Sequence, residues 1–110
     1  MPWILLAAFI LVGGCATQTP DPLAGWKPLF GREYEQLDEA IRGDYQNYIL
    51  TLTPKERQSP SVHFYGDGTG QHAVEIIIGL NGRWWRHILI YDKENNRIKA
   101  IKYATGYYAS

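Results

Sequence analysis

The chain has only one cysteine, Cys15, so it can form no internal disulfide. It also has no excess of charge, because eleven Lys and Arg residues balance eleven Asp and Glu residues, and this balance gives no basic footprint for nucleic acid. No apolar run approaches the ~20 residues of a membrane-spanning helix. An apolar core must therefore supply the stability, and four Trp, eight Tyr and three Phe are present to build it.

The longest apolar stretch, Trp3 to Val12, ends just before Gly13, Gly14 and Cys15. Roughly 7–15 apolar residues followed by small ones are typical of a secretory signal peptide. The pattern resembles the lipobox of bacterial lipoproteins, in which an aliphatic residue and two small residues precede the cysteine. The resemblance implies acylation of the Cys15 thiol, cleavage after Gly14 and acylation of the new N-terminus.

The resemblance implies three regions: a signal peptide over residues 1–14, a lipidated Cys15 with a flexible tether over 15–25, and a single small domain over 26–110. The polar, proline-containing composition after Cys15 agrees with a semi-extended tether. Lipoproteins of this kind carry more than one acyl chain, which anchors a protein stably where a single chain does not. Residues 1–14 contain no Lys or Arg, so the positive charge of the signal comes from the terminal amine or from residues upstream of Met1.

An amphipathic helix is expected after Pro28, because apolar residues recur there at spacings of three and four. The helix is predicted to end near Leu52, since a proline follows Thr53. Gly43 interrupts the pattern, which predicts either a kink at this residue or two shorter helices. Thr53 and Glu56 form a capping-box pattern that predicts one further turn. The apolar stripe comprises Phe30, Tyr34, Leu37, Ile41, Tyr45, Tyr48 and Leu52.

From residue 61 the apolar pattern alternates, which indicates β-strands. Asn81-Gly82 is a strong signal for a two-residue type I′ hairpin turn, and the glycine-rich segment 66–70 is expected to be a loop. The predicted fold class is α+β, with the N-terminal helix packed on one face of a four-stranded antiparallel meander. The four strands are expected at residues 62–65, 71–80, 83–91 and 97–103.

The hairpin turn sets the strand register, which places His72 opposite Tyr91 and assigns each residue to one face of the sheet. One face is nearly all apolar and should receive the helix. The outer strands extend this apolar face to Val62, Phe64, Ile98 and Ala100. The other face is mixed, and it carries Glu75 diagonal to Arg86 as an expected exposed ion pair.

The mixed face carries a candidate interaction surface, because large exposed apolar patches mark interaction sites and Trp and Tyr are enriched at binding hot spots. Alternatively, the tether, the second helical segment or the C-terminal tail at 106–108 folds over these residues. The candidate surface comprises Trp84, Ile77, Ile88, Ile90, Ile101, Tyr65 and Tyr103.

Residues that carry chemistry are few. A candidate ligand pocket between helix and sheet involves His72, Tyr91 and Asp67. His72 and His87 are offset by about 13 Å along their paired strands, which is too far for one zinc ion, so no metal and no cofactor is predicted. The loop at Asp67 precedes a strand rather than the helix that a phosphate-binding loop requires. No serine has a nucleophile-elbow pattern, and Cys15 is expected to be acylated, so no catalytic residue is predicted.

Together these features predict a lipid-anchored cell-envelope protein whose domain is a non-catalytic interaction module. The expected partners are the membrane, through the lipid anchor, and either another envelope protein or a second copy of the chain. Ala16 rather than Asp follows the cysteine, which in the sorting pattern of the lipoprotein family favours the outer membrane, facing the periplasm. The alternatives are a periplasmic inhibitor or a small-ligand-binding lipoprotein and, less favoured, a small hydrolase.

Overall fold

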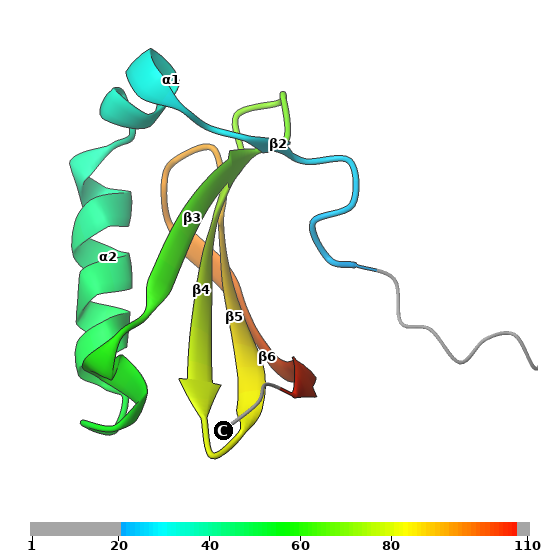
Figure 1. Ribbon diagram of the computed structural model, residues 1–110. Coiled ribbons are helices and arrows are strands. Elements are labelled where there is room, and N and C mark those ends of the chain that lie inside the picture. The colour runs from blue at the N-terminus through cyan, green and yellow to red at the C-terminus, as the bar shows by residue number, and fades with distance from the viewer. Residues whose placement is uncertain (1–20, 108–110) are drawn as a thin grey trace, which may run out of the picture.

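The computed structural model describes residues 21–107, which form an α+β fold of short helices and a five-stranded antiparallel sheet. The strand order β2-β3-β4-β5-β6 follows the chain, so the predicted meander is confirmed, with β2 as one additional short strand (Figure 1). The bounds are β2 Lys27–Pro28, α1 Gly31–Glu35, α2 Glu39–Leu50, the 3-10 helix η2 Glu56–Gln58, β3 Ser61–Gly66, β4 His72–Leu80, β5 Arg83–Tyr91 and β6 Arg97–Tyr107.

The β4–β5 hairpin has the register that its turn predicts, with His72 opposite Tyr91. Asn81 and Gly82 have φ angles of 55° and 81°, the positive values that a type I′ turn requires at both central positions. Because side chains alternate along these strands, the sheet has one face toward α1 and α2 and a second face turned away from them. We call the second one the distal face.

The predicted helix is divided, but not at Gly43. Helix α1 ends at Glu35 and α2 begins at Glu39. Between them Asp38 caps α2, because its carboxylate accepts a hydrogen bond from the Ala40 amide at 2.7 Å. The expectation of a break at Gly43 is wrong, since this residue lies inside α2. A capping side chain favours a helix start, whereas one interior glycine costs only about 1 kcal/mol.

The turn after α2 contains the predicted capping box. The Glu56 amide donates to Thr53 Oγ1 at 3.2 Å, and the Glu56 carboxylate accepts a hydrogen bond from the Thr53 amide at 3.0 Å. The Thr53 amide lowers the pKa of Glu56 below its ordinary value. The box therefore starts η2 and holds a charged carboxylate in a position that is only 8% exposed.

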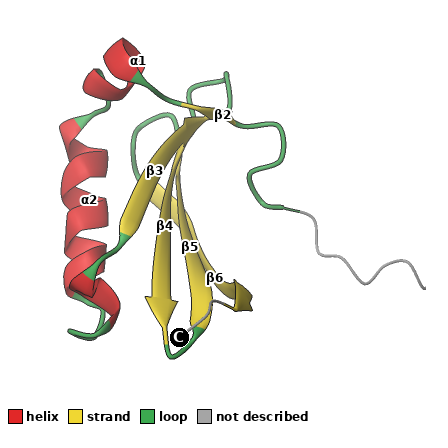
Figure 2. Cartoon of the chain, in the orientation of Figure 1, coloured by secondary structure: helices red, strands yellow, loops and turns green. Residues whose placement is uncertain are grey.

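The main core lies between the helices and the sheet, which form two layers (Figure 2). The helix stripe packs there as predicted, with Leu37 and Ile41 buried. Phe30 is an exception at 72% exposure, because it precedes the first turn of α1 as the N-cap residue. The buried core comprises Leu37, Ile41, Phe64, Val74, Ile76, Ile78, Leu89 and Tyr91.

Strand β6 departs from the predicted facing near its start. Tyr91 pairs with Arg97 and Ile90 pairs with Lys99, so Ile98 is the extra residue of a β-bulge. Ile98 is 56% exposed, and the prediction that it lies on the core face is wrong. Alternation along a strand assumes an unbroken ladder, and a bulge shifts that alternation by one residue.

Residues 21–25, which the sequence assigns to the tether, belong to the fold. Leu23 is 6% exposed and packs on the distal face against Ala73 and Ile88. The predicted tether boundary at residue 25 is therefore wrong, because the folded domain includes Asp21 and the residues after it. The predicted signal peptide and Cys15 lie outside the described residues.

Candidate functional site

The distal face holds a second, smaller core where the sequence predicts an exposed interaction surface. Ile88 and Ala73 are 0% and 1% exposed and pack with Leu23, so the prediction that Ile88 is exposed is wrong. Leu23, which the sequence assigns to the tether, thus covers Ala73 and Ile88. This outcome agrees with the alternative in which the tether folds over the predicted surface. Five further side chains pack partly buried around these three residues: Trp26, Tyr65, Ile90, Ile101 and Tyr103.

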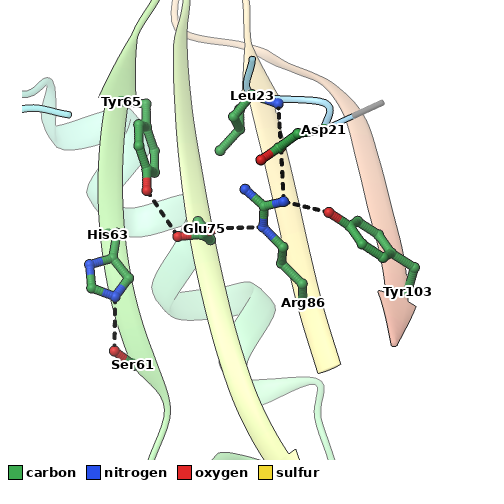
Figure 3. Close-up of polar contacts among 8 residues, drawn as sticks. All are labelled: Asp21, Leu23, Ser61, His63, Tyr65, Glu75, Arg86 and Tyr103. Carbon is green, nitrogen blue, oxygen red and sulfur yellow. Dashed lines mark hydrogen bonds and ion pairs between the residues drawn. The ribbon is translucent and has the colours of Figure 1, made fainter. Parts of the chain in front are cut away.

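Arg86 on β5 joins the N-terminal segment to the sheet (Figure 3). Its Nη1 donates to Asp21 Oδ1 at 2.9 Å and to the Tyr103 hydroxyl, and its Nε donates to the Glu75 carboxylate. The Tyr65 hydroxyl also donates to Glu75, at 3.1 Å. The predicted Glu75–Arg86 pair is thus present, but its side chains are only 8% and 12% exposed. The expectation that this pair is exposed is wrong.

The hydrogen-bond partners in this network favour the ionised forms of Arg86 and Asp21. Burial alone would lower the pKa of Arg86, but its hydrogen bonds to Asp21, Tyr103 and Glu75 raise it. The Leu23 amide, which donates to Asp21 at 2.9 Å, and then Arg86 lower the pKa of the Asp21 carboxyl. Both partners are therefore ionised at neutral pH. We call Asp21 and Leu23, with their contacts on β4 and β5, the N-terminal clamp.

Trp84 is the exposed part of the predicted interaction surface. Its exposure is 40%, whereas Ile77 is partly buried. Trp84 pairs with Gly79 on β4 and with Gly106 on β6, so neither directly opposed residue has a side chain to cover the indole ring. The ring also borders a hollow of about 220 Å³ whose other lining residues are Lys55, Glu56, Gln58, Ser59 and Gly79.

The structure places His72 directly opposite Tyr91, with the loop of Asp67 just before β4, but Tyr91 and Asp67 each hold a hydrogen bond within the fold. Tyr91 is buried and its hydroxyl donates to Asp44 on α2 at 2.6 Å; burial, and then Asp44, raises the pKa of this hydroxyl. The Asp67 carboxylate accepts hydrogen bonds from the amides of Thr69 and Gln71 at 2.8 and 3.1 Å. Asp67 therefore closes its own loop, in agreement with the loop prediction for 66–70.

The histidines lie apart and have separate environments. His63 is exposed on β3, where its ring hydrogen-bonds to Ser61 at 3.0 Å. His87 is 1% exposed on the helix-facing side, and its Nδ1 shares a hydrogen bond of 2.7 Å with the Tyr48 hydroxyl. Burial lowers the pKa of His87 and so favours its neutral form.

Within residues 21–107, no three His, Cys, Asp or Glu side chains group closely enough to hold a metal ion. In the same part of the chain, no helix has the length and apolar character needed to cross a membrane.

Comparison with protein-family models, with curated proteins and with solved structures finds no match to this chain.

Sequence reasoning missed the clamp. Asp21 and Leu23 lie in a segment whose polar, proline-containing composition is typical of a tether. The one available signal was Leu23, an isolated large aliphatic residue among polar and small ones. The partner of Asp21 is Arg86, 65 residues further along the chain, and no local pattern connects the two.

Proposed function

We propose that this protein is a lipid-anchored component of a bacterial cell envelope, with the lipid on Cys15 and the α+β domain serving as a non-catalytic interaction module. The proposal extends to the outer membrane, with the domain facing the periplasm. The observation that carries it is the N-terminal clamp, which lies directly after the predicted anchor region and attaches it to the centre of the sheet.

The distance along the chain makes the clamp informative. Asp21 follows Cys15 by six residues, and six residues in fully extended conformation reach at most about 20 Å. A domain attached in this way stays close to the bilayer. A clamp on β5 also transmits any pull on the anchor to the sheet, since an ion pair and a buried leucine hold the segment at two points.

The interaction surface of this proposal is the exposed remainder of the distal face. Trp84 is its most exposed aromatic side chain, and partly buried Ile101 and Tyr103 lie on the neighbouring strand. Tryptophan at a concave or lightly covered position is a frequent anchor of binding energy. The surface and the clamp share one face of the sheet.

The test is the substitution Cys15→Ser, compared with Ala16→Ser as a matched control that keeps the cysteine. Wild type and the control are expected in the membrane fraction, with a mature N-terminus whose mass includes acyl chains. The Cys15→Ser protein is expected to be soluble or to keep residues 1–14. Normal membrane retention of Cys15→Ser would overturn the proposal.

A further inference from the structure

We infer that two copies of this chain pair through the open edge of strand β3, so that their sheets join into one continuous antiparallel sheet. The inference goes beyond the proposed function, because it concerns a different surface and does not depend on a lipid at Cys15. Three features support it: the backbone groups of this edge, the register that two-fold symmetry permits, and a groove beside the strand.

The outer side of β3 is covered over only part of its length. Strand β4 pairs with β3 from end to end, whereas β2 pairs only with Tyr65 and Gly66 (Figure 1). The residue after β2, Leu29, still donates its amide to the Phe64 carbonyl at 2.9 Å. Among the described residues, no backbone group pairs with the outer side of Ser61–His63. This part of β3 is therefore an open edge of the sheet.

The outward backbone groups of this open edge belong to Val62. Backbone groups of successive residues point to opposite sides of a strand. Because the Phe64 carbonyl points outward to Leu29, the N–H and C=O of Val62, two residues earlier, point outward as well. A donor and an acceptor on one residue form two hydrogen bonds with a residue of an added antiparallel strand. The edge therefore fits an extended backbone as its partner.

Two-fold symmetry leaves one register that satisfies both groups of Val62. With the axis at Val62, each Val62 amide donates to the Val62 carbonyl of the other copy. An axis at Ser61 would place Val62 opposite Pro60, which has no N–H for its carbonyl. An axis at His63 would place it opposite Phe64, whose carbonyl already accepts a hydrogen bond within its own chain. The edge thus complements a second copy of itself in the register centred on Val62.

The side chains of the open edge agree with this register. Ser61 of one copy lies opposite His63 of the other, and a hydroxyl and an imidazole are hydrogen-bonding partners, as they are within one copy at 3.0 Å. Residues 61–64 contain no Asp, Glu, Lys or Arg, so no like charges meet across the axis.

The opposite edge of the sheet differs in this respect. Strand β6 contains three basic residues, and its ladder with β5 has two shifts of register. Charged side chains and bulges are features by which proteins protect an edge strand from pairing. Strand β3 has no Lys or Arg and no shift of register with β4. Of the two edges, the β3 edge is therefore the one suited to pairing.

A groove of about 390 Å³ lies beside the open edge, and Phe30, Tyr34 and Val62 are among its lining residues. In the register centred on Val62, Pro60 and Val62 of the second copy lie opposite Phe64 and Val62 on the helix-facing side of the joined sheet. The groove thus adjoins two apolar side chains of the second copy. Phe30, which is 72% exposed, gains apolar neighbours there.

The symmetry also fixes how the two domains are oriented. A two-fold axis that relates paired antiparallel strands is perpendicular to the sheet. The helix layers of both copies therefore lie on one side of the joined sheet, and both N-terminal clamps lie on the other. This arrangement lets two copies attached to one surface pair without either turning over.

Cysteine cross-linking tests the register. The whole chain carries Cys15→Ser, so an introduced cysteine is its only thiol. Across the proposed axis, the Cα atoms of positions 61 and 63 are about 4.5 Å apart, a separation that a disulfide spans. Mixing Ser61→Cys with an affinity-tagged His63→Cys should give a mixed disulfide dimer on mild oxidation, in several times the yield of either variant alone. Ile98→Cys, at an exposed position on β6, is the control and should remain monomeric.

A proline variant tests the hydrogen bonds. Val62→Pro removes an N–H that points away from the β3–β4 ladder, and proline is tolerated at such edge positions, so circular dichroism should match the parent. Each copy loses its donor. Two hydrogen bonds at about 1 kcal/mol each correspond to a rise of about 30-fold in the dimer dissociation constant, measured by sedimentation equilibrium. Val62→Ala keeps the N–H and is the matched control, with a smaller rise expected.

The outcomes separate this inference from the proposed function. A mixed disulfide no more abundant than the disulfides of the single variants overturns the pairing, and this result decides alone if Val62→Pro fails to fold. A dissociation constant unchanged by Val62→Pro would assign the contact to another surface and also overturn it. Protection of a label at position 63 only after other envelope proteins are added would assign the edge to a different partner, with the same consequence. Absence of acylation at Cys15 overturns the proposed function and leaves the pairing intact.

Discussion

Replacing Arg86 with Leu tests whether the clamp depends on a buried guanidinium. The Glu75 side chain is 8% exposed and would keep the Tyr65 hydroxyl as its hydrogen-bond donor. Removing one member of a buried ion pair costs about 3–5 kcal/mol, because the other charge stays buried without compensation. The Asp21 side chain is 54% exposed, so solvent screens that contact and it adds little. We therefore expect a loss of about 3 kcal/mol in the free energy of unfolding.

Urea denaturation of the mature chain carrying Cys15→Ser measures this loss. The matched control is Arg97→Leu, because the Arg97–Asp44 pair at 3.3 Å has side chains 35% and 34% exposed and should contribute less than about 1 kcal/mol. The double variant Glu75→Leu with Arg86→Leu should recover most of the loss, since it leaves no buried charge unpaired. Equal losses for the two arginine variants, or no recovery in the double variant, would refute the reasoning.

Two further predictions concern single side chains. Leu23→Ala should lower the free energy of unfolding by about 2 kcal/mol and speed proteolysis within residues 21–26, whereas Phe30→Ala at an exposed position should change stability little; equal effects would contradict the assignment of Leu23 to the clamp. The lowered pKa of His87 means that the unfolded chain binds a proton that the folded chain resists. Stability should therefore fall as the pH drops below about 6.5, by at most about 1.4 kcal/mol per pH unit. In His87→Asn, the free energy of unfolding measured with urea should depend less on pH across this range; an unchanged pH dependence would assign it to another group.

Much of the fold followed from patterns within a few residues. The Asn81-Gly82 turn predicted the register between β4 and β5, because both residues must adopt positive φ and the strands then have no freedom to slip. The capping box of Thr53 and Glu56 was also readable, since its hydrogen bonds join residues three positions apart. Local patterns failed where a neighbouring element interfered, as with the bulge at Ile98.

The sequence by itself thus determined the α+β class, the hairpin and the resemblance of residues around Cys15 to a lipobox, because each depends on neighbours along the chain. The tertiary structure alone decided which face of the sheet is covered and how the segment after the anchor region is held. Asp21 meets Arg86 across 65 residues, and Leu23 buries Ile88 from a segment whose composition is that of a tether. Such contacts depend on the free energy of burial over the whole fold, which no short window of the sequence contains.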